Sequence, residues 1–349
     1  MRPSRRGADM ESLETHIPGG DGLQPGERSV LRRASVKAGP YFVRYGTIAA
    51  FVAVVALFSI ARPDTFATWE NWKAILNLGS VVMIIAAALT VPMIMGDFDL
   101  SVGYNTQLMG AVAIVLLANQ AVSTGLTVAC TLLLGAAVGA VIGAIVAWSK
   151  VSAFVITLGA GTIMLGIELR VTNGGRNIFE GIPSSFNAIA TTEFLGLQLP
   201  IWITFGVFLV LWFITEHTVI GRYMAAIGGN PEAARLSGIR VEVIRLVGFV
   251  IVGVGAALAG IILTAQAQQY YANAATGYLL PAYAGVFLGA ATLRVNQFHV
   301  FGTLIGVLFM QTIQTGLIIM NYSAYLANVI QGAVLIVAVL LSRVGSRSP

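Results

Sequence analysis

Charged residues are scarce in this chain. Of its 349 residues, 57% are hydrophobic and only 10% are charged. A soluble domain has about a quarter charged residues, which it needs to cover a water-facing surface. The composition therefore excludes an ordinary soluble fold. It predicts an all-α polytopic membrane protein, whose spans of roughly 20 residues each cross a hydrocarbon layer about 30 Å thick.

Cysteine and lysine are also rare, and this limits the chemistry available to the chain. A single cysteine, Cys130, excludes an intrachain disulfide, and the three scattered histidines form no metal-binding pattern. The three lysines, Lys37, Lys73 and Lys150, are followed by alanine or valine, so the phosphate-binding GxxxxGK[ST] loop is absent. No Ser/His/Asp or Cys/His arrangement is present either. We predict that the chain is not an enzyme and holds no cofactor and no metal.

Few carboxylates lie near the apolar runs. They are Asp97, Asp99, Glu168 and Glu216. Glu168 and Glu216 fall at the ends of apolar runs and are interpreted as interfacial anchors, whereas Asp97 and Asp99 lie at a break between two runs. Ion-coupled carriers place ionisable groups inside the bilayer. The pattern therefore disfavours an ion-coupled secondary transporter, which is kept as an alternative.

Ten apolar runs follow the first 40 residues, which predicts about ten transmembrane helices. They lie near 42–61, 74–95, 101–118, 125–148, 153–171, 200–215, 246–267, 278–293, 299–320 and 324–342. An even number of spans places both termini on one side. Of the 20 Lys and Arg residues, 16 then share that side, and Arg62, Lys73, Arg170 and Arg176 face the other. The positive-inside rule therefore predicts that both termini are cytoplasmic.

The predicted organisation has three parts. Residues 1–40 contain no apolar run and are predicted to be a disordered cytoplasmic tail. Residues 41–343 form the transmembrane domain, and 344–349 form a short cytoplasmic C-terminus. Within the domain, the loop at about 216–245 would be cytoplasmic, and 172–199 would be the main external loop.

Glycines recur every four residues in two of the runs. Gly135, Gly139 and Gly143 share one helix face, and Gly302 and Gly306 repeat the spacing later in the chain. Small residues at this spacing let the backbones of two helices approach closely. These positions predict tight helix packing.

Neutral amide side chains also lie within the runs, and they are the candidate lining of a solute path. Gln311 and Gln314 share one helix face. Amides both donate and accept hydrogen bonds, which suits a neutral, hydroxyl-rich solute. The alternative is that these side chains join helices, and that Tyr270 and Tyr271 belong to an aromatic belt. The candidate path residues are Asp97, Asp99, Asn105, Gln107, Gln311 and Gln314.

The stretch GDFDLSVGYNTQ, residues 96–107, is predicted to break the path of the chain through the membrane. Pro92 and Gly96 interrupt the preceding span, and Asp99 or Ser101 can cap the helix that follows. Irregular backbone at this depth must be surrounded by protein or water.

The stretch GGNPEAARLSGIR, residues 228–240, predicts a short capped helix in the cytoplasmic loop. Asn230 suits the N-cap, Pro231 the first turn, and Gly238 a left-handed C-cap. The helix would run from about Pro231 to Ser237, after Gly228–Gly229 as a flexible turn. Its exposed residues would include the apolar set Ala233, Ala234 and Leu236.

A helix this short is marginal in water on its own, because isolated helices need about 12 residues or more. It therefore either packs on its own protein or docks into the groove of a partner.

Three motifs together resemble the permease subunit of ribose/xylose/galactoside-type ABC sugar importers. They are GDFDLSVG (96–103), KVSAFVITLGAGTI (150–163) and GRYMAAIGGNPEAARLSGIRV (221–241), and the similarity runs from about residue 45 to 342. The resemblance implies the ABC importer permease fold in a bacterial cell membrane. It implies a translocation path for a monosaccharide, polyol or similar small hydroxylated solute.

The partners implied by the resemblance are a cytoplasmic ABC ATPase subunit, a second permease subunit and an extracytoplasmic solute-binding protein, with membrane lipid around the spans. ATP hydrolysis would then occur on the separate ATPase. The short cytoplasmic helix would be the coupling helix, seated on the ATPase. Its residues are Asn230, Pro231, Glu232, Ala233, Ala234, Arg235, Leu236, Ser237 and Gly238.

Two places depart from the pattern of that family. Asp97 stands where the family commonly has glycine, and LGAATLRVNQFHVFG (288–302) stands where a glycine-rich loop is expected. Because non-glycine residues resist positive φ, we expect a different backbone course near Arg294, Asn296, Gln297 and His299. The solute stays open, and a branched-chain amino-acid or autoinducer-type permease is the alternative within the importer class.

Overall fold

The computed structural model of the chain describes residues 45–118, 122–294 and 297–344. Two units are distinguished, Met1–Pro40 and Tyr41–Pro349, and only the second contains described residues. The predicted tail, residues 1–40, and the predicted C-terminal segment after residue 344 lie outside the described residues.

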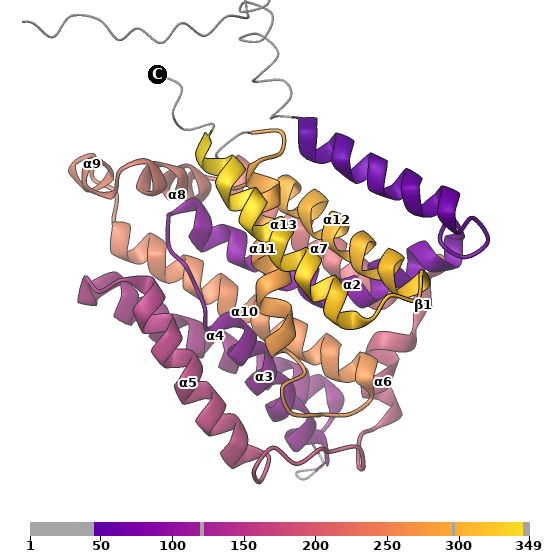
Figure 1. Ribbon diagram of the computed structural model, residues 1–349. Coiled ribbons are helices and arrows are strands. Elements are labelled where there is room, and N and C mark those ends of the chain that lie inside the picture. The colour runs from indigo at the N-terminus through magenta and orange to yellow at the C-terminus, as the bar shows by residue number, and fades with distance from the viewer. Residues whose placement is uncertain (1–44, 119–121, 295–296, 345–349) are drawn as a thin grey trace, which may run out of the picture. The chain divides into compact units, whose positions relative to one another are not determined.

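The described part of the chain is almost entirely helical (Figure 1). Its helices are Tyr45–Ala61, α2 Trp69–Ile94, α3 Val102–Ala118, α4 Thr124–Ser149, α5 Ala153–Val171, α6 Ser184–Thr191, α7 Leu199–Trp212, the π-helical turn Phe213–His217, α8 Val219–Gly229, α9 Pro231–Leu236, α10 Val241–Ala267, the 3-10 turn Thr276–Tyr278, α11 Leu279–Ala290, α12 Val300–Ile319 and α13 Ala324–Val344. Each of the ten apolar runs coincides with a helix.

Six helices among the described residues are long and apolar enough to cross a membrane. They are α2, α4, α5, α7 extended through His217, α10 and α12. At 1.5 Å per residue, the 26 residues of α2 reach about 39 Å, more than the hydrocarbon thickness of about 30 Å. Helix Tyr45–Ala61, α3 and the segment Tyr325–Val337 of α13 are apolar but shorter. The chain is thus a multi-pass membrane protein, and the number of ten crossings stays a prediction.

Helices α4 and α10 are in backbone contact through glycines. A Cβ atom added to Gly135 would lie 2.5 Å from the carbonyl oxygen of Gly253, and one added to Gly139 would lie 2.3 Å from that of Phe249. A Cβ on Gly143 would meet the Phe249 side chain at 2.8 Å. The predicted packing role of the three glycines of α4 is confirmed, and α10 is their partner.

Helices α11 and α12 use the same device. A Cβ on Gly306 would lie 2.1 Å from the Gly285 carbonyl oxygen, and one on Gly302 would lie 2.4 Å from that of Gly289. The prediction for this second pair of glycines is confirmed as well.

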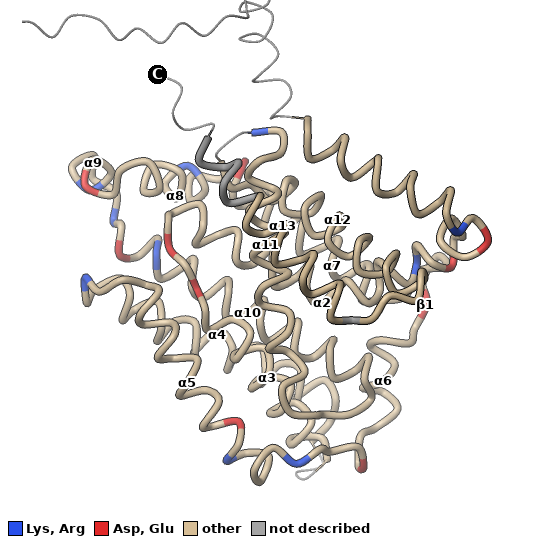
Figure 2. Tube along the Cα trace, viewed as in Figure 1, with Lys and Arg blue, Asp and Glu red and all other residues tan. Residues whose placement is uncertain are grey.

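The largest buried apolar cluster is centred on α2 and α10. It also receives side chains from α7, α11 and α12, and from the short helices α8 and α9. Figure 2 shows that charged residues are sparse along the middle of the long helices and gather around α8 and α9 and at the lower end of α5. The short helices are therefore firmly attached to the membrane-spanning core.

The segment 172–199, predicted as the main external loop, contains regular structure. Helix α6 is followed by β1 Glu193–Phe194 and β2 Leu197–Gln198, which pair antiparallel. Leu195 and Gly196, with φ of 52° and 76°, form the two-residue turn between them. Positive φ at both central residues is the requirement of a type I′ hairpin turn.

We predict that Gly139→Val destabilises the protein, because the new side chain would enter the Phe249 backbone of α10. Overpacking of this kind costs about 1–3 kcal/mol or more. The measurement is the melting temperature in detergent, followed by fluorescence-detected size-exclusion chromatography. The matched control is Gly159→Val on α5, where the site is exposed and no atom lies within 4 Å of the added Cβ. Equal melting temperatures for the two variants would contradict the packing assignment.

Candidate functional site: coupling helix and solute path

Helix α9 is capped at both ends as the sequence predicts. The Asn230 side-chain oxygen accepts hydrogen bonds from the backbone N–H groups of Glu232 and Ala233, both at 3.0 Å. At the other end Gly238 has φ of 84°, and the N–H of Ile239 donates to the carbonyl of Ala234 at 3.1 Å. The caps satisfy backbone groups that a two-turn helix cannot pair within itself.

Two details of the prediction for this segment are wrong. Gly228 and Gly229 form no flexible turn, because they are the last two residues of α8. Ala234 is buried with 4% exposure and belongs to the main apolar cluster, so it is not part of the exposed set. The reason is its small side chain, which lets α9 lie close against the core.

The outer face of α9 carries an apolar side chain that nothing in the described residues covers. Leu236 is 83% exposed, and Ala233 is exposed beside it. Arg235 forms ion pairs with Glu232 at 2.8 Å and with Glu242, at the start of α10, at 2.6 Å. The helix is therefore held in place from within while Leu236 faces outward.

The break between α2 and α3 is stabilised by side chains, as the prediction of irregular backbone within the membrane requires. Pro92 lies in the last turn of α2, and Gly96 has φ of 83°. The Tyr283 hydroxyl donates to the Asp99 carbonyl and accepts from the Asp99 N–H, both at 2.9 Å. The Leu100 N–H donates to the Thr157 hydroxyl at 3.0 Å.

Asp99 is a capping residue. Its carboxylate accepts hydrogen bonds from the backbone N–H of Ser101, at 2.8 Å, and from the Ser101 hydroxyl, and its side chain is buried. Of the two predicted caps, the aspartate therefore caps the start of α3.

Asp97 has a charged partner. Its carboxylate lies 3.0 Å from the Nε of Arg245 on α10. Both groups line a cavity of about 260 Å³ whose wall includes Lys150 and Ser152, at the turn between α4 and α5. The extra acid of this chain is thus neutralised within the protein.

Glu168 is no interfacial anchor, contrary to prediction. Its side chain is buried, with 2% exposure. The carboxylate accepts hydrogen bonds from the hydroxyl of the equally buried Tyr270 and from the side-chain amide of Gln107, the latter at 3.5 Å. Gln107 also accepts from the N–H of Ala275 at 2.7 Å and donates to the carbonyl of Tyr271 at 3.0 Å. The interpretation of Tyr270 as an aromatic-belt residue is wrong too.

This buried cluster joins α3, α5 and the segment after α10. The sequence shows a carboxylate, an amide and two tyrosines within or beside apolar runs. It does not show which of these side chains form hydrogen bonds with one another. The isolated β-bridge between Ile178 and Tyr270 attaches the segment 172–199 to the same cluster.

The remaining candidate path residues are spread over the fold. Asn105 is buried on α3, and its side-chain oxygen has no hydrogen-bond partner among the described residues. On α12, the Gln314 oxygen accepts from the Gln331 amide at 3.2 Å, and Gln311 packs on Gly79 of α2. Within the described residues the two α12 glutamines thus contact other helices and do not join Asn105 or Gln107.

The loop that departs from the glycine-rich pattern is stabilised by an ion pair. Arg294 lies 2.7 Å from Glu216 in the π-helical turn, so the Glu216 carboxylate has a charged partner within the protein. Leu293 takes φ of 63° although it is not glycine, which shows that this chain accepts a left-handed residue there. His299 occupies the N-cap position of α12 without a side-chain capping hydrogen bond, and burial together with the charge of Arg294 lowers its pKa. Asn296 lies outside the described residues.

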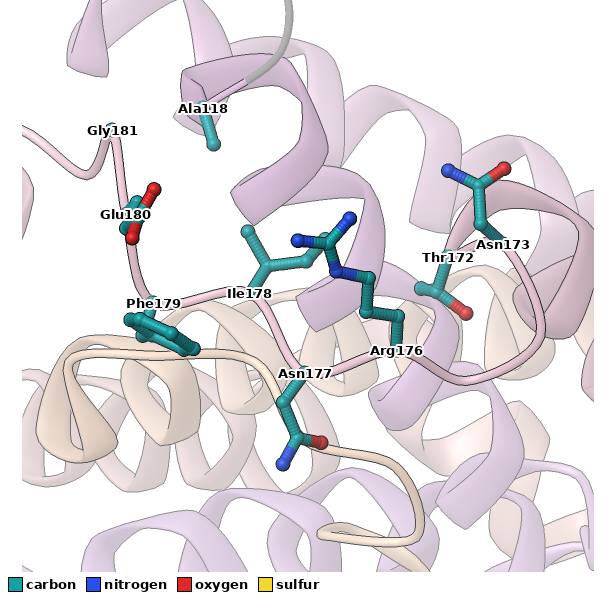
Figure 3. A pocket seen from close by; sticks show the side chains of 9 residues that line it. All are labelled: Ala118, Thr172, Asn173, Arg176, Asn177, Ile178, Phe179, Glu180 and Gly181. Carbon is teal, nitrogen blue, oxygen red and sulfur yellow. The ribbon is translucent and has the colours of Figure 1, made fainter.

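A polar pocket of about 340 Å³ lies in the segment 172–199, beside the end of α3 (Figure 3). It is lined by Ala118, Thr172, Asn173, Arg176, Asn177, Ile178, Phe179, Glu180 and Gly181. In Figure 1 the end of α5 that leads into this segment lies far from α9. Among the described residues, no group of three or more His, Cys, Asp or Glu side chains could hold a metal ion.

We predict that Glu168→Ala destabilises the protein by about 1–3 kcal/mol, because the Tyr270 hydroxyl and the Gln107 amide would lose a buried acceptor. Tyr270→Phe removes the same hydrogen bond from the other side. The two effects on the melting temperature in detergent should therefore be less than additive in the double variant. Strict additivity would show that the two residues act independently.

Comparison with known proteins shows that this chain is similar to membrane permeases. Residues 71–339 match a family model described as the permease component of the branched-chain amino acid transport system. The ribose import permease of Escherichia coli strain K12 is 36% identical over 312 residues, which cover 89% of this chain and 96% of the relative. The D-allose transport system permease of the same strain is 32% identical over 307 residues, 88% of this chain and 94% of the relative.

An autoinducer 2 import system permease from Salmonella choleraesuis is 32% identical over 289 residues, 82% of each chain. No solved structure gives a significant match. The range 71–339 matched by the family model contains the three motifs that carry the resemblance and most of the described helices. The chain therefore belongs to the family of permease subunits of the ribose/xylose/galactoside type of ABC importer.

Proposed function

We propose that this permease carries a monosaccharide, polyol or similar small hydroxylated solute across a bacterial cell membrane, driven by ATP hydrolysis on a separate subunit. The observation that carries the proposal is α9, a capped helix fixed to the core through Ala234 while Leu236 is 83% exposed. An exposed leucine on a rigid short helix fits insertion into a groove of a partner. The absence of a phosphate-binding loop from the sequence explains why such a partner is needed.

The proposed partners are a cytoplasmic ABC ATPase that receives α9, a second permease subunit, and an extracytoplasmic solute-binding protein. The basic residues support an orientation with both termini and α9 in the cytoplasm and the segment 172–199 outside. We further propose that the ten apolar runs, each of which forms a helix, cross the membrane about ten times. The helices α3, α11 and α13 would be stabilised in the membrane by packing against longer helices.

The solute class rests on two observations. The buried polar side chains that α3 adds after the break, Asn105 and Gln107, are neutral. The buried carboxylates nearby have partners within the protein: Asp97 pairs with Arg245, Asp99 binds Ser101, and Glu168 binds Gln107. Relatives with high coverage are named for import of ribose and D-allose. The autoinducer 2 relative and the branched-chain amino acid system named by the family model favour a second candidate, a permease for an autoinducer-type solute or a branched-chain amino acid.

The first test is uptake by proteoliposomes that contain the permease, the ABC ATPase encoded with it and its solute-binding protein. We expect accumulation of a radiolabelled pentose or hexose that requires ATP and survives dissipation of proton and sodium gradients. A panel that includes polyols, autoinducer 2 and leucine distinguishes the solute classes. Uptake by the permease alone, driven by an ion gradient, would instead establish the secondary-transporter alternative.

The second test concerns α9. Leu236→Asp should weaken binding of the ATPase by about 2 kcal/mol, roughly 30-fold, because a buried apolar anchor would become a charge. Membrane insertion and melting temperature should stay unchanged, since the side chain is exposed in the permease alone. The measurement is co-purification of the ATPase with the tagged permease.

The matched control is Leu195→Asp, which places the same substitution at an exposed leucine in the β1–β2 turn. It should leave ATPase binding intact. Equal retention of the ATPase by both variants would remove the assignment of α9 as the docking helix.

A further inference from the structure

The segment that carries α9 touches the end of α2 directly, at the start of the break. Gly228, in the last turn of α8, packs so closely that an added Cβ would lie 1.9 Å from the Ile94 carbonyl oxygen. After α9 the chain returns to the same place, where a Cβ on Gly248 of α10 would meet the Met95 side chain at 2.4 Å. The elements before and after α9 thus both contact Ile94–Met95.

Charged contacts run from α9 to the same break. Arg235 of α9 binds Glu242 at the start of α10, at 2.6 Å. Arg245 lies three residues further along α10, about one helical turn, on the same face as Glu242. Its Nε lies 3.0 Å from the carboxylate of Asp97, in the segment between α2 and α3. Two ion pairs separated by one turn therefore connect the short helix to the break.

The inner of these two pairs is more buried than the outer, chiefly at its carboxylate. The Asp97 side chain is 9% exposed and that of Arg245 is 25% exposed, against 49% and 30% for Arg235 and Glu242. Neither the Nε of Arg245 nor the Oδ2 of Asp97 forms a directed hydrogen bond with any described residue. The buried carboxylate of Asp97 is compensated mainly by the partly buried guanidinium of Arg245, and such a pair resists separation because a lone buried charge is costly.

The surroundings leave this contact room to move. The pair lines the cavity of about 260 Å³ beside Lys150, which is the other cation on its wall. On the far side of the break, Tyr283 holds both the N–H and the carbonyl of Asp99. The segment 95–98 therefore lies between a fixed point on α11 and an ionic contact on α10.

We propose that Asp97 and Arg245 are positioning residues that transmit displacement of α9 to the α2–α3 break, and so couple ATP hydrolysis to movement of the solute path. This rests on the proposed docking of α9 on an ATPase. When α9 is displaced, α10 moves with it through Arg235 and Glu242, and Arg245 carries Asp97 along. The break, which the candidate path residues Asn105 and Gln107 follow on α3, changes position as a result.

The test compares charge-removed and charge-exchanged variants in the assembled transporter with its ATPase and binding protein in proteoliposomes. The double variant Asp97→Asn/Arg245→Gln leaves no unpaired buried charge, so it avoids the folding penalty of a single substitution. We expect it to retain ATPase co-purification and to transport roughly tenfold less solute per ATP hydrolysed, within the range of coupling residues. The exchanged pair Asp97→Arg/Arg245→Asp should recover part of that loss.

Asp64→Asn, at an exposed loop position, is the control and should match the unmodified protein. Unchanged solute per ATP in the double variant would overturn the proposal, and so would loss of ATPase binding, which would place the pair in docking. These results are distinct from failure of the docking assignment itself, which shows as retention of the ATPase by Leu236→Asp.

Discussion

The fold depends on the hydrogen bonds that pair the backbone N–H and C=O groups between α2 and α3 inside a membrane protein. Peptide groups without partners are costly in apolar surroundings, and hydrocarbon offers none. Here the Tyr283 hydroxyl serves both backbone groups of Asp99, Thr157 binds the next N–H, and the Asp99 carboxylate caps α3. Because side chains of α5 and α11 supply these hydrogen bonds, both helices must pack beside this short segment.

Glycine contacts make the rest of the helix bundle stiff enough for that segment to matter. Gly135 and Gly253 bring α4 and α10 into backbone contact, and Gly285 and Gly306 do so for α11 and α12. Close-packed elements of this kind move as bodies, because their interfaces cannot be deformed continuously. A displacement of α9 therefore has a defined route inward through α8 and α10, both of which touch the end of α2.

The sequence predicted the features that depend on local chemistry. The caps of α9, the break after Pro92 and the glycine faces follow from φ preferences and side-chain size, and all are present. What depends on which distant side chains meet was not predictable. The sequence predicted interfacial positions for Glu168 and Tyr270, whereas the fold joins them in a buried hydrogen bond. It also predicted that Ala234 is exposed, whereas the small side chain of Ala234 lets α9 pack against the core. The partner of Asp97 lies far along the chain on α10, and no spacing rule points to Arg245.

The central claim is that α9 and the α2–α3 break move together when the ATPase acts. Hydrogen–deuterium exchange of residues 94–101 in the permease–ATPase complex tests it most directly, by comparing the nucleotide-free state with an ATP-bound state of a hydrolysis-deficient ATPase. The account predicts that exchange in this segment changes on ATP binding, and that Asp97→Asn/Arg245→Gln abolishes the change while the ATPase stays bound. The same exchange in both nucleotide states of the unmodified complex would contradict it.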